Sequence, residues 1–255
     1  MPVNYVSVEE AMEADGLRMI VVGGTASPWG EAAKGILHVK NINWLAVRLD
    51  YKSETLKNWA GQRAGPVAFY NDERPRTSSA EILLLAERLA PSPPLLPKDA
   101  ADRALVVGLS HEIHAEGGLG WTRRLQLVDA GLKGEGGFSE RVAQYLARKY
   151  GYRAEEAPSY TDRVTSLLAM LADRLKSQGD SGSRYLVGTD LTAADIYCAA
   201  FMGLFSPLPP EHSPDETQRD IFNTLDEQTK LALDPILLQH RDRIYEQHLE
   251  LPLSL

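Results

Sequence analysis

The sequence predicts a small α/β domain followed by a larger all-helical domain, and three observations lead to this fold class. Strand-like and helix-like patterns alternate over residues 1–90. Four prolines then fall within seven positions, 91–97, where neither a helix nor a central strand can continue. Beyond them only helical periodicity is found. We therefore expect domains at 1–90 and 100–255, joined by a semi-rigid linker at 91–99.

Short apolar runs and capping residues give the order of elements in the first domain. An N-terminal extension, 1–16, carries Ser7-x-x-Glu10, which is the capping box of a short helix. Strands and helices then alternate, with strands expected at 17–23, 44–49 and 66–70 and helices at 28–39, 53–59 and 78–89.

The second domain is expected to contain helices alone. Their ranges are 100–116, 121–131, 138–150, 160–178, 192–204 and 215–248. Thr192-Ala-Ala-Asp195 is a capping box, to which we assign a structural role.

Composition excludes several classes of protein. The net charge of −8 and pI near 5.3 offer no broad basic face, so no nucleic-acid partner is expected. No apolar run approaches the roughly 20 residues that cross a bilayer, and no signal peptide is recognised, so no membrane partner is expected. The single cysteine, Cys198, excludes an internal disulfide and favours a cytoplasmic location.

The segment Ser27–Glu31 (Ser-Pro-Trp-Gly-Glu) carries the first functional signal. Pro28 suits the first turn of a helix, which places Ser27 at the N-cap, at the positive end of the helix dipole. An anionic nucleophile is stabilised at such a position. The structural alternative is that the Ser27 hydroxyl only caps the helix.

Two further sites have both a functional and a structural interpretation. Gly65-Pro66 opens a strand: a cis bond there exposes backbone groups that pair with an extended peptide ligand, and the alternative is an ordinary trans strand start. Ser78 and Ser79 begin a helix whose N-terminus suits a carboxylate, and simple capping is the alternative.

Other motifs are interpreted as structural. His111 and His114 lie three apart on a helix but do not form H-E-x-x-H, so no metal site is expected. Val21–Gly24 lacks the remaining glycines of a dinucleotide turn, which makes a nucleotide-dependent oxidoreductase a poor alternative. Cys198 is expected to be a buried, inert thiol.

In order and spacing, these motifs resemble the cytosolic glutathione transferase family over residues 17–205. Ser27–Glu31 resembles the omega-like Cys-Pro-Phe-Ala-Glu segment, with serine in place of cysteine. Gly65-Pro66 resembles the Val-cis-Pro step, and Ser78-Ser79 the Glu-Ser pair. Tyr185–Asp195 resembles the folding signature of the C-terminal domain.

The resemblance implies a thioredoxin-like N-terminal domain plus an all-α C-terminal domain, which is the glutathione transferase fold. It also implies glutathione as co-substrate, a small electrophilic partner, a homodimer and a role in detoxification. The implied catalytic residue is Ser27, which holds the glutathione sulfur as a thiolate. The implied site residues are, for glutathione, Trp29, Gln62, Arg63, Gly65, Pro66, Ser78 and Ser79, and for the electrophile pocket, Trp29, His111 and Trp121.

A second function stays open alongside the enzyme. Ser78 stands where the family has Glu or Gln, and the segment after residue 205 is unassigned. Both features motivate a non-catalytic protein of the same fold that binds glutathione or apolar ligands, or acts as an interaction scaffold.

Overall fold

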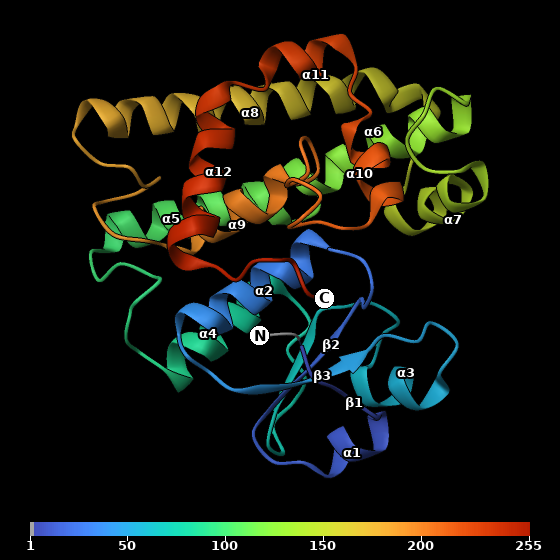
Figure 1. The fold of residues 1–255 in the computed structure, drawn as a ribbon, viewed down its shortest axis with the longest axis vertical. Coiled ribbons are helices and arrows are strands. Elements are labelled where there is room, and N and C mark those ends of the chain that lie inside the picture. Colours follow the sequence, from blue (N-terminus) through green and yellow to red (C-terminus); the bar gives the residue numbers. More distant parts are fainter. Residues whose placement is uncertain (1–2) are drawn as a thin grey trace. The chain divides into compact units, whose positions relative to one another are not determined.

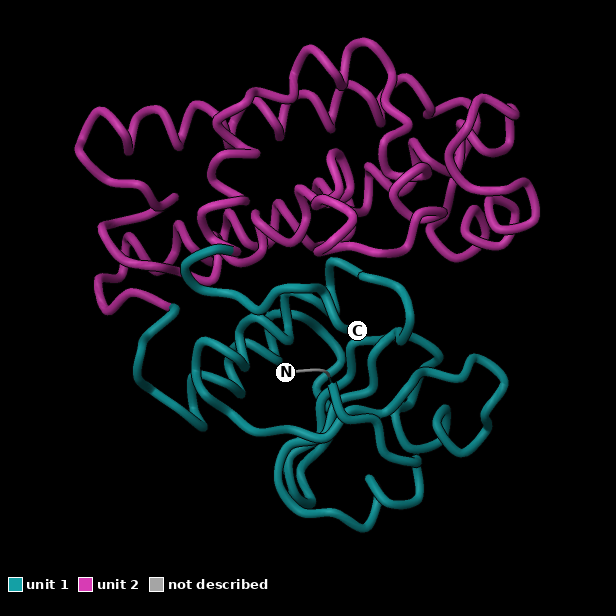
Figure 2. Tube along the Cα trace, in the orientation of Figure 1, with its two compact units in different colours: residues 1–95, 246–255 teal, residues 96–245 magenta. Residues whose placement is uncertain are grey.

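The computed structural model describes residues 3–255, and the chain divides into two compact units (Figure 2). Unit 1 contains the residues up to Leu95 together with Glu246–Leu255, and unit 2 contains Leu96–Tyr245. The helical domain expected from the sequence spans 100–255, whereas in the structure Glu246–Leu255 group with unit 1.

Unit 1 is a four-stranded sheet with helices on both faces (Figure 1). Its elements are β1 (Tyr5–Val6), α1 (Val8–Glu13), β2 (Leu17–Val21), α2 (Pro28–Val39), β3 (Trp44–Arg48), α3 (Glu54–Ala60), β4 (Val67–Tyr70) and α4 (Ser79–Leu89). The strand order is β1-β3-β2-β4, with β4 antiparallel to β2 and the other pairs parallel. Every expected element of this domain is present, within one or two residues of its expected bounds.

Strand β1 was missed because two residues give no periodic signal. It adds an edge strand to β3, with Tyr5 opposite Ala46 and Val6 opposite Val47.

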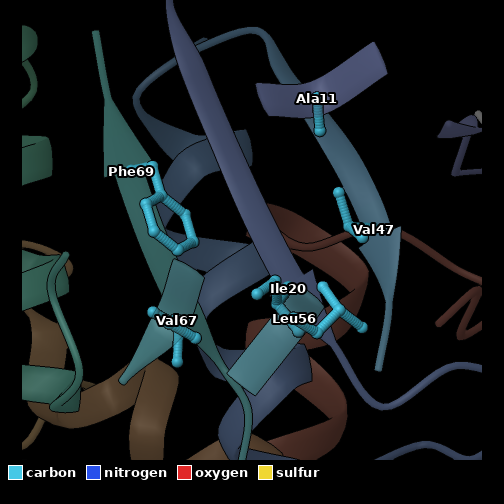
Figure 3. Packing of buried hydrophobic residues seen from close by; sticks show 7 residues of the cluster. Ala11, Ile20, Val47, Leu56, Val67 and Phe69 are labelled. Carbon is cyan, nitrogen blue, oxygen red and sulfur yellow. The ribbon is translucent and has the colours of Figure 1, made fainter. Parts of the chain in front are cut away.

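Strand alternation divides the sheet residues between two apolar faces. On one face, Ile20 lies opposite Val47 and Val67. This row packs with residues of α1 and α3 in a buried cluster (Figure 3): Ala11, Ile20, Val47, Leu56, Ala60, Val67 and Phe69. On the other face, Met19 lies opposite Ala46 and Ala68, and α2 and α4 lie side by side over it (Figure 1).

Unit 2 is helical throughout. Its elements are α5 (Ala100–His114), α6 (Leu119–Lys133), α7 (Glu140–Tyr150), a 3₁₀ turn η1 (Ala154–Glu156), α8 (Ala157–Asp180), α9 (Ala193–Met202), α10 (Glu216–Asn223), α11 (Glu227–Ala232) and α12 (Pro235–His248), whose last residues belong to unit 1. Every residue of α9 is buried, so this helix is the core of the unit. Gly120 allows α6 to approach it closely, because a Cβ at that position would lie 2.2 Å from the Phe201 ring.

The single helix expected at 215–248 is wrong: the structure has three helices there. Asp226 caps α11 by accepting a hydrogen bond from Thr229 N at 2.8 Å. Pro235 then begins α12, and a proline disfavours helical geometry in the residue before it. Apolar periodicity continued across both breaks, which is why the sequence suggested one helix.

Candidate functional site

Ser27 is the N-cap of α2, at the carboxyl end of β2, and Pro28 follows at the first helical position. Its backbone is extended (φ −70°, ψ 122°), and its carbonyl accepts the first helical hydrogen bond from Glu31 N at 2.8 Å. The side chain makes no capping hydrogen bond. The hydroxyl thus lies at the positive end of the helix dipole without accepting a hydrogen bond from the helix, and the interpretation of Ser27 as a side-chain cap is wrong.

The loop before Ser27 lies against a cation. A Cβ on Gly23 would come within 2.9 Å of Arg48 Cζ and 3.0 Å of Tyr5 Oη, and one on Gly24 within 3.2 Å of Arg48 Nη1. The Arg48 guanidinium also lies 4.8 Å from the Tyr5 ring centroid. The two glycines thus make room for Arg48, which explains the Gly23-Gly24 pair without a nucleotide.

The first two turns of α2 contain a buried ion pair. Lys34 Nζ lies 2.7 Å from Glu31 Oε2, and each side chain is 3% exposed. Because Lys34 neutralises Glu31, the carboxylate does not cancel the positive field at the helix N-terminus.

The Gly65–Pro66 peptide bond is cis, as the functional interpretation expects. Close packing also explains why residue 65 is a glycine. A Cβ there would lie 3.1 Å from the Ile20 carbonyl oxygen and 3.5 Å from Val21 Cα. Glycine thus allows the start of β4 to approach the backbone of β2 closely, next to the loop that leads to Ser27.

Ser78 and Ser79 begin α4, where the chain's own carboxylate occupies part of the helix terminus. Ser78 Oγ accepts from Glu81 N at 3.2 Å, while Glu81 Oε2 accepts from Ser78 N at 3.3 Å and Thr77 N at 3.0 Å. Arg74, 2.7 Å from Glu81, contributes most to lowering the pKa of that carboxyl. The capping interpretation of Ser78 is confirmed, and Ser79 is the first residue of the helix.

Gln62 and Arg63 follow α3, just after its left-handed C-cap Gly61. Arg63 donates to the Tyr51 carbonyl oxygen at 2.6 Å and pairs with Glu54. This arginine is therefore engaged with residues at the start of α3, and both Gln62 and Arg63 are half-buried.

The three residues expected in the electrophile pocket are divided between the units. Trp29 lies in α2 of unit 1, whereas His111 and Trp121 lie in α5 and α6 of unit 2. Within unit 2, Trp121 packs against Tyr150, with ring centroids 4.5 Å apart, and His111 faces His114 at 6.3 Å. The structure thus gives His111 and Trp121 different neighbours.

The two histidines of α5 have different environments. His111 is exposed, while burial lowers the pKa of His114 to about 4, with a smaller effect from His111. His114 also contacts the Tyr197 ring at 4.7 Å. Among residues 3–255, no group of three or more His, Cys, Asp or Glu side chains is arranged to hold a metal ion.

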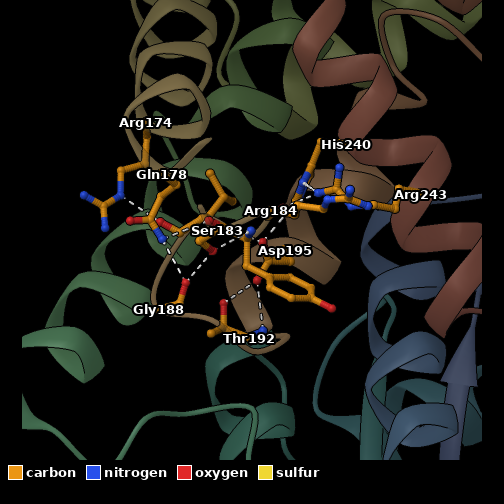
Figure 4. Close-up of polar contacts among 11 residues, drawn as sticks. Arg174, Gln178, Ser183, Arg184, Gly188, Thr192, Asp195, His240 and Arg243 are labelled. Carbon is orange, nitrogen blue, oxygen red and sulfur yellow. Dashed lines mark hydrogen bonds and ion pairs between the residues drawn. The ribbon is translucent and has the colours of Figure 1, made fainter. Parts of the chain in front are cut away.

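The expected capping box of α9 is present, and it forms the centre of a polar network (Figure 4). The Asp195 carboxylate accepts from Thr192 N at 2.9 Å, Thr192 Oγ1 at 2.7 Å and Leu186 N at 2.7 Å. His240 of α12 lies 3.4 Å from Asp195. Burial raises the pKa of Asp195 to about 6, and its fully buried position supports the structural role.

Cys198 is fully buried in α9, and burial raises the pKa of its thiol well above the usual range. It is inert, as expected. Over the described part of the chain, none of the helices combines the length and the apolar character needed to span a bilayer.

Comparison with known proteins gives the fold. No protein-family model matches the sequence, and no curated protein matches it. Solved structures do. A glutathione S-transferase from Methylobacterium radiotolerans, in complex with glutathione sulfonate, has a TM-score of 0.62 at 19% identity and covers 91% of each chain.

Two further solved structures are similar to this chain over most of its length. A glutathione S-transferase from Methylobacillus flagellatus with glutathione bound has a TM-score of 0.63 at 14% identity, covering 91% of this chain and 96% of its own. Glutathione transferase Omega 3C from Trametes versicolor has a TM-score of 0.59 at 15% identity, covering 94% and 89%. The chain therefore has the glutathione transferase fold, with a thioredoxin-like unit and a helical unit.

Several contacts around the Ser27 segment were not expected from the sequence: Tyr5 and Arg48 against Gly23 and Gly24, the Glu31–Lys34 ion pair, and Leu255 against Gly30. Only Glu31 and Lys34 left a signal, as opposite charges three residues apart on an otherwise apolar helix. The other three reach the loop through pairing and packing that no local pattern encodes.

Proposed function

We propose that this chain is a glutathione transferase of the serine type. One observation carries the proposal: the Ser27 hydroxyl stands at the N-terminus of α2 and is not used to cap it. A donor held there, in the field of the helix dipole, stabilises a thiolate. The omega-like form of the Ser27–Glu31 segment belongs to the same proposal.

Glutathione is proposed to lie extended along the start of β4. The backbone at Gly65 and Pro66 would pair with its cysteinyl part, and Ser79 would receive the γ-glutamyl carboxylate. Ser78 contributes by fixing the helix terminus through its cap. Trp29 and Gln62 are assigned to the rest of the tripeptide, and Arg63 takes part only if its pairing with Glu54 opens.

The proposed chemistry needs one proton transfer and one substitution. The glutathione thiol loses its proton to solvent, and Ser27 Oγ–H donates a hydrogen bond to the resulting thiolate. This lowers the thiol pKa from about 8.5 toward neutrality. The sulfur lone pair then forms a C–S bond with an electrophilic carbon, and the leaving group departs with its electron pair. Ser27 is not modified in the cycle.

The electrophile is proposed to be mostly apolar, with Trp29, His111 and Trp121 as candidate contacts. We also propose a homodimer, which sedimentation of the purified protein measures directly. The single cysteine supports the proposal of a reducing, cytoplasmic compartment.

A non-catalytic protein that binds glutathione or apolar ligands is the second candidate, and a specific observation favours it. Glu81 occupies backbone donors at the α4 terminus, where the ligand carboxylate is expected, and Arg63 is already paired. Both contacts compete with a bound tripeptide.

Conjugation of glutathione to an aryl halide separates the two candidates. For a transferase, we expect turnover by the wild type and a fall in kcat/KM of about 10- to 100-fold in Ser27→Ala, the loss of one hydrogen bond to a charged group. Tight glutathione binding in calorimetry, without turnover on a panel of electrophiles, supports the binding protein. Binding of NAD without glutathione contradicts both.

A further inference from the structure

The last segment of the chain runs along α2 and ends beside Ser27. His38 Nδ1 lies 3.6 Å from Glu250 Oε2, Lys34 Nζ donates to Ser254 Oγ at 3.1 Å, and Leu255 N donates to Glu31 Oε1 at 3.3 Å. These contacts pass from the last turn of α2 to its first turn as the segment advances. All of them lie within unit 1 (Figure 2).

The buried Glu31–Lys34 ion pair of α2 holds this segment in place through hydrogen bonds. Glu31 and Lys34 have almost no access to water, so each needs hydrogen bonds within the protein. The segment supplies them, through Leu255 N to Glu31 and through Ser254 Oγ to Lys34. The ion pair therefore does more than stabilise α2, because its hydrogen bonds to the segment fix the position of Leu255.

Leu255 stands next to the proposed catalytic residue. A Cβ built on Gly30 would lie 2.8 Å from Leu255 Cδ1 and 3.9 Å from Ser27 Cβ. The Leu255 methyl group and Ser27 Cβ are therefore separated by no more than the sum of these two distances. Glycine at position 30 leaves this space to the leucine.

The segment that carries Leu255 is rich in leucine. Leucines occupy every second position, at 249, 251, 253 and 255, while the polar residues Glu250 and Ser254 contact α2. Leu255 is 8% exposed, and the three leucines before it are half-buried. An apolar side chain beside a reactive sulfur can contact the apolar group that the sulfur attacks.

We propose that Leu255, held in place by the Glu31–Lys34 pair, forms an apolar wall of the electrophile site beside Ser27. The inference rests on the proposed function and deepens it: the second substrate carries an aryl or alkyl group that packs on this leucine. The segment thereby contributes to substrate choice from within the glutathione-binding unit.

The test compares glutathione with S-hexylglutathione, whose alkyl chain reports on the wall, by calorimetry on the wild type and Leu255→Ala. We expect Leu255→Ala to bind S-hexylglutathione about four- to tenfold more weakly, since each buried methylene is worth about fourfold in affinity. Its affinity for glutathione should change by less than about twofold. Leu231→Ala, the same change at an 87% exposed position of unit 2, is the control and should alter neither affinity.

A second variant guards against misfolding of Leu255→Ala. Gly30→Ala adds the Cβ that would meet Leu255 and should displace the leucine, with the same selective loss of S-hexylglutathione affinity. Adding Leu255→Ala to Gly30→Ala should then cause no further loss.

The outcomes separate this inference from the proposed function. Unchanged S-hexylglutathione affinity in folded Leu255→Ala, with glutathione still bound, overturns the wall and leaves the transferase intact. Equal losses for both ligands overturn it too, since Leu255 would then act on the glutathione site as a whole. If the wild type binds neither ligand, the proposed function fails, and this inference fails with it.

Discussion

At Ser27 and Ser78, the same residue type begins two helices in different ways. Ser78 forms a complete capping box with Glu81, whereas the Ser27 side chain makes no capping hydrogen bond. Pro28 does not explain the difference, because it removes the N–H of the first helical position, whereas a capping side chain accepts from the second or third. Because no capping hydrogen bond fixes the orientation of the Ser27 side chain, its O–H can be directed toward a ligand.

This difference predicts opposite effects on stability. Ser78→Ala should lower the free energy of unfolding by about 1 kcal/mol, the usual cost of a lost N-cap. Ser27→Ala should leave it nearly unchanged while reducing activity. Urea denaturation of both variants checks this, and a comparable loss of stability in Ser27→Ala would show that its hydroxyl does cap the helix.

A second prediction at the scale of one residue concerns the effect of Gly65 on stability. Gly65→Ala should destabilise the protein by about 1–3 kcal/mol, because its Cβ would lie 3.1 Å from the backbone oxygen of Ile20, which cannot move freely. Gly108→Ala in α5 is the matched control, with nothing within 4 Å of the added Cβ. It should stabilise by about 0.5–1 kcal/mol through helix propensity. Thermal unfolding of the pair tests both signs.

At the scale of elements, α2 connects the sheet, the loop of Ser27 and the last segment of the chain. Its buried Glu31–Lys34 ion pair contacts the last segment through Leu255 N and Ser254 Oγ. Lys34→Met should lower the free energy of unfolding by about 3–5 kcal/mol, because Glu31 would stay buried without its cation. Glu31→Leu combined with Lys34→Met should recover most of the loss. A double variant no more stable than Lys34→Met alone would contradict this account.

The elements show where a sequence is informative and where it is not. Helix α2 could be predicted to the residue because Pro28 and the apolar run mark it locally. Strand β1 and the breaks on either side of α11 could not, since two residues have no periodicity and an apolar pattern continued through the breaks. The Ser27 segment was found from its cap chemistry, but Arg48 and Leu255 reach it only through tertiary packing.

At the scale of the whole molecule, buried histidines make stability depend on pH. The pKa of His114 is lowered to about 4 and that of His240 to about 3, in both cases mainly by burial. A lowered pKa means that the unfolded chain binds the proton first. Stability from these groups is therefore full above about pH 6.5 and is lost as the pH falls toward 4 and below. Asp195, with a raised pKa near 6, opposes part of this loss between pH 6 and 4.

The His114→Gln variant isolates the contribution of His114 to the pH dependence of stability. The wild type should lose up to about 3 kcal/mol between pH 7 and pH 4 because of this histidine, and the variant should lose correspondingly less. His111→Gln removes only the neighbouring charge and should give a smaller effect of the same sign. Urea denaturation across this pH range is the measurement, and parallel pH profiles for the wild type and His114→Gln would contradict the assignment.

The central claim is that the Ser27 hydroxyl holds the sulfur of bound glutathione as a thiolate. Titration of the bound thiol, followed by the ultraviolet absorbance of the thiolate, tests it most directly. In the wild type the bound thiol should titrate well below about 8.5, and in Ser27→Ala its pKa should return toward that value. Equal pKa values for glutathione bound to the two proteins would contradict the claim.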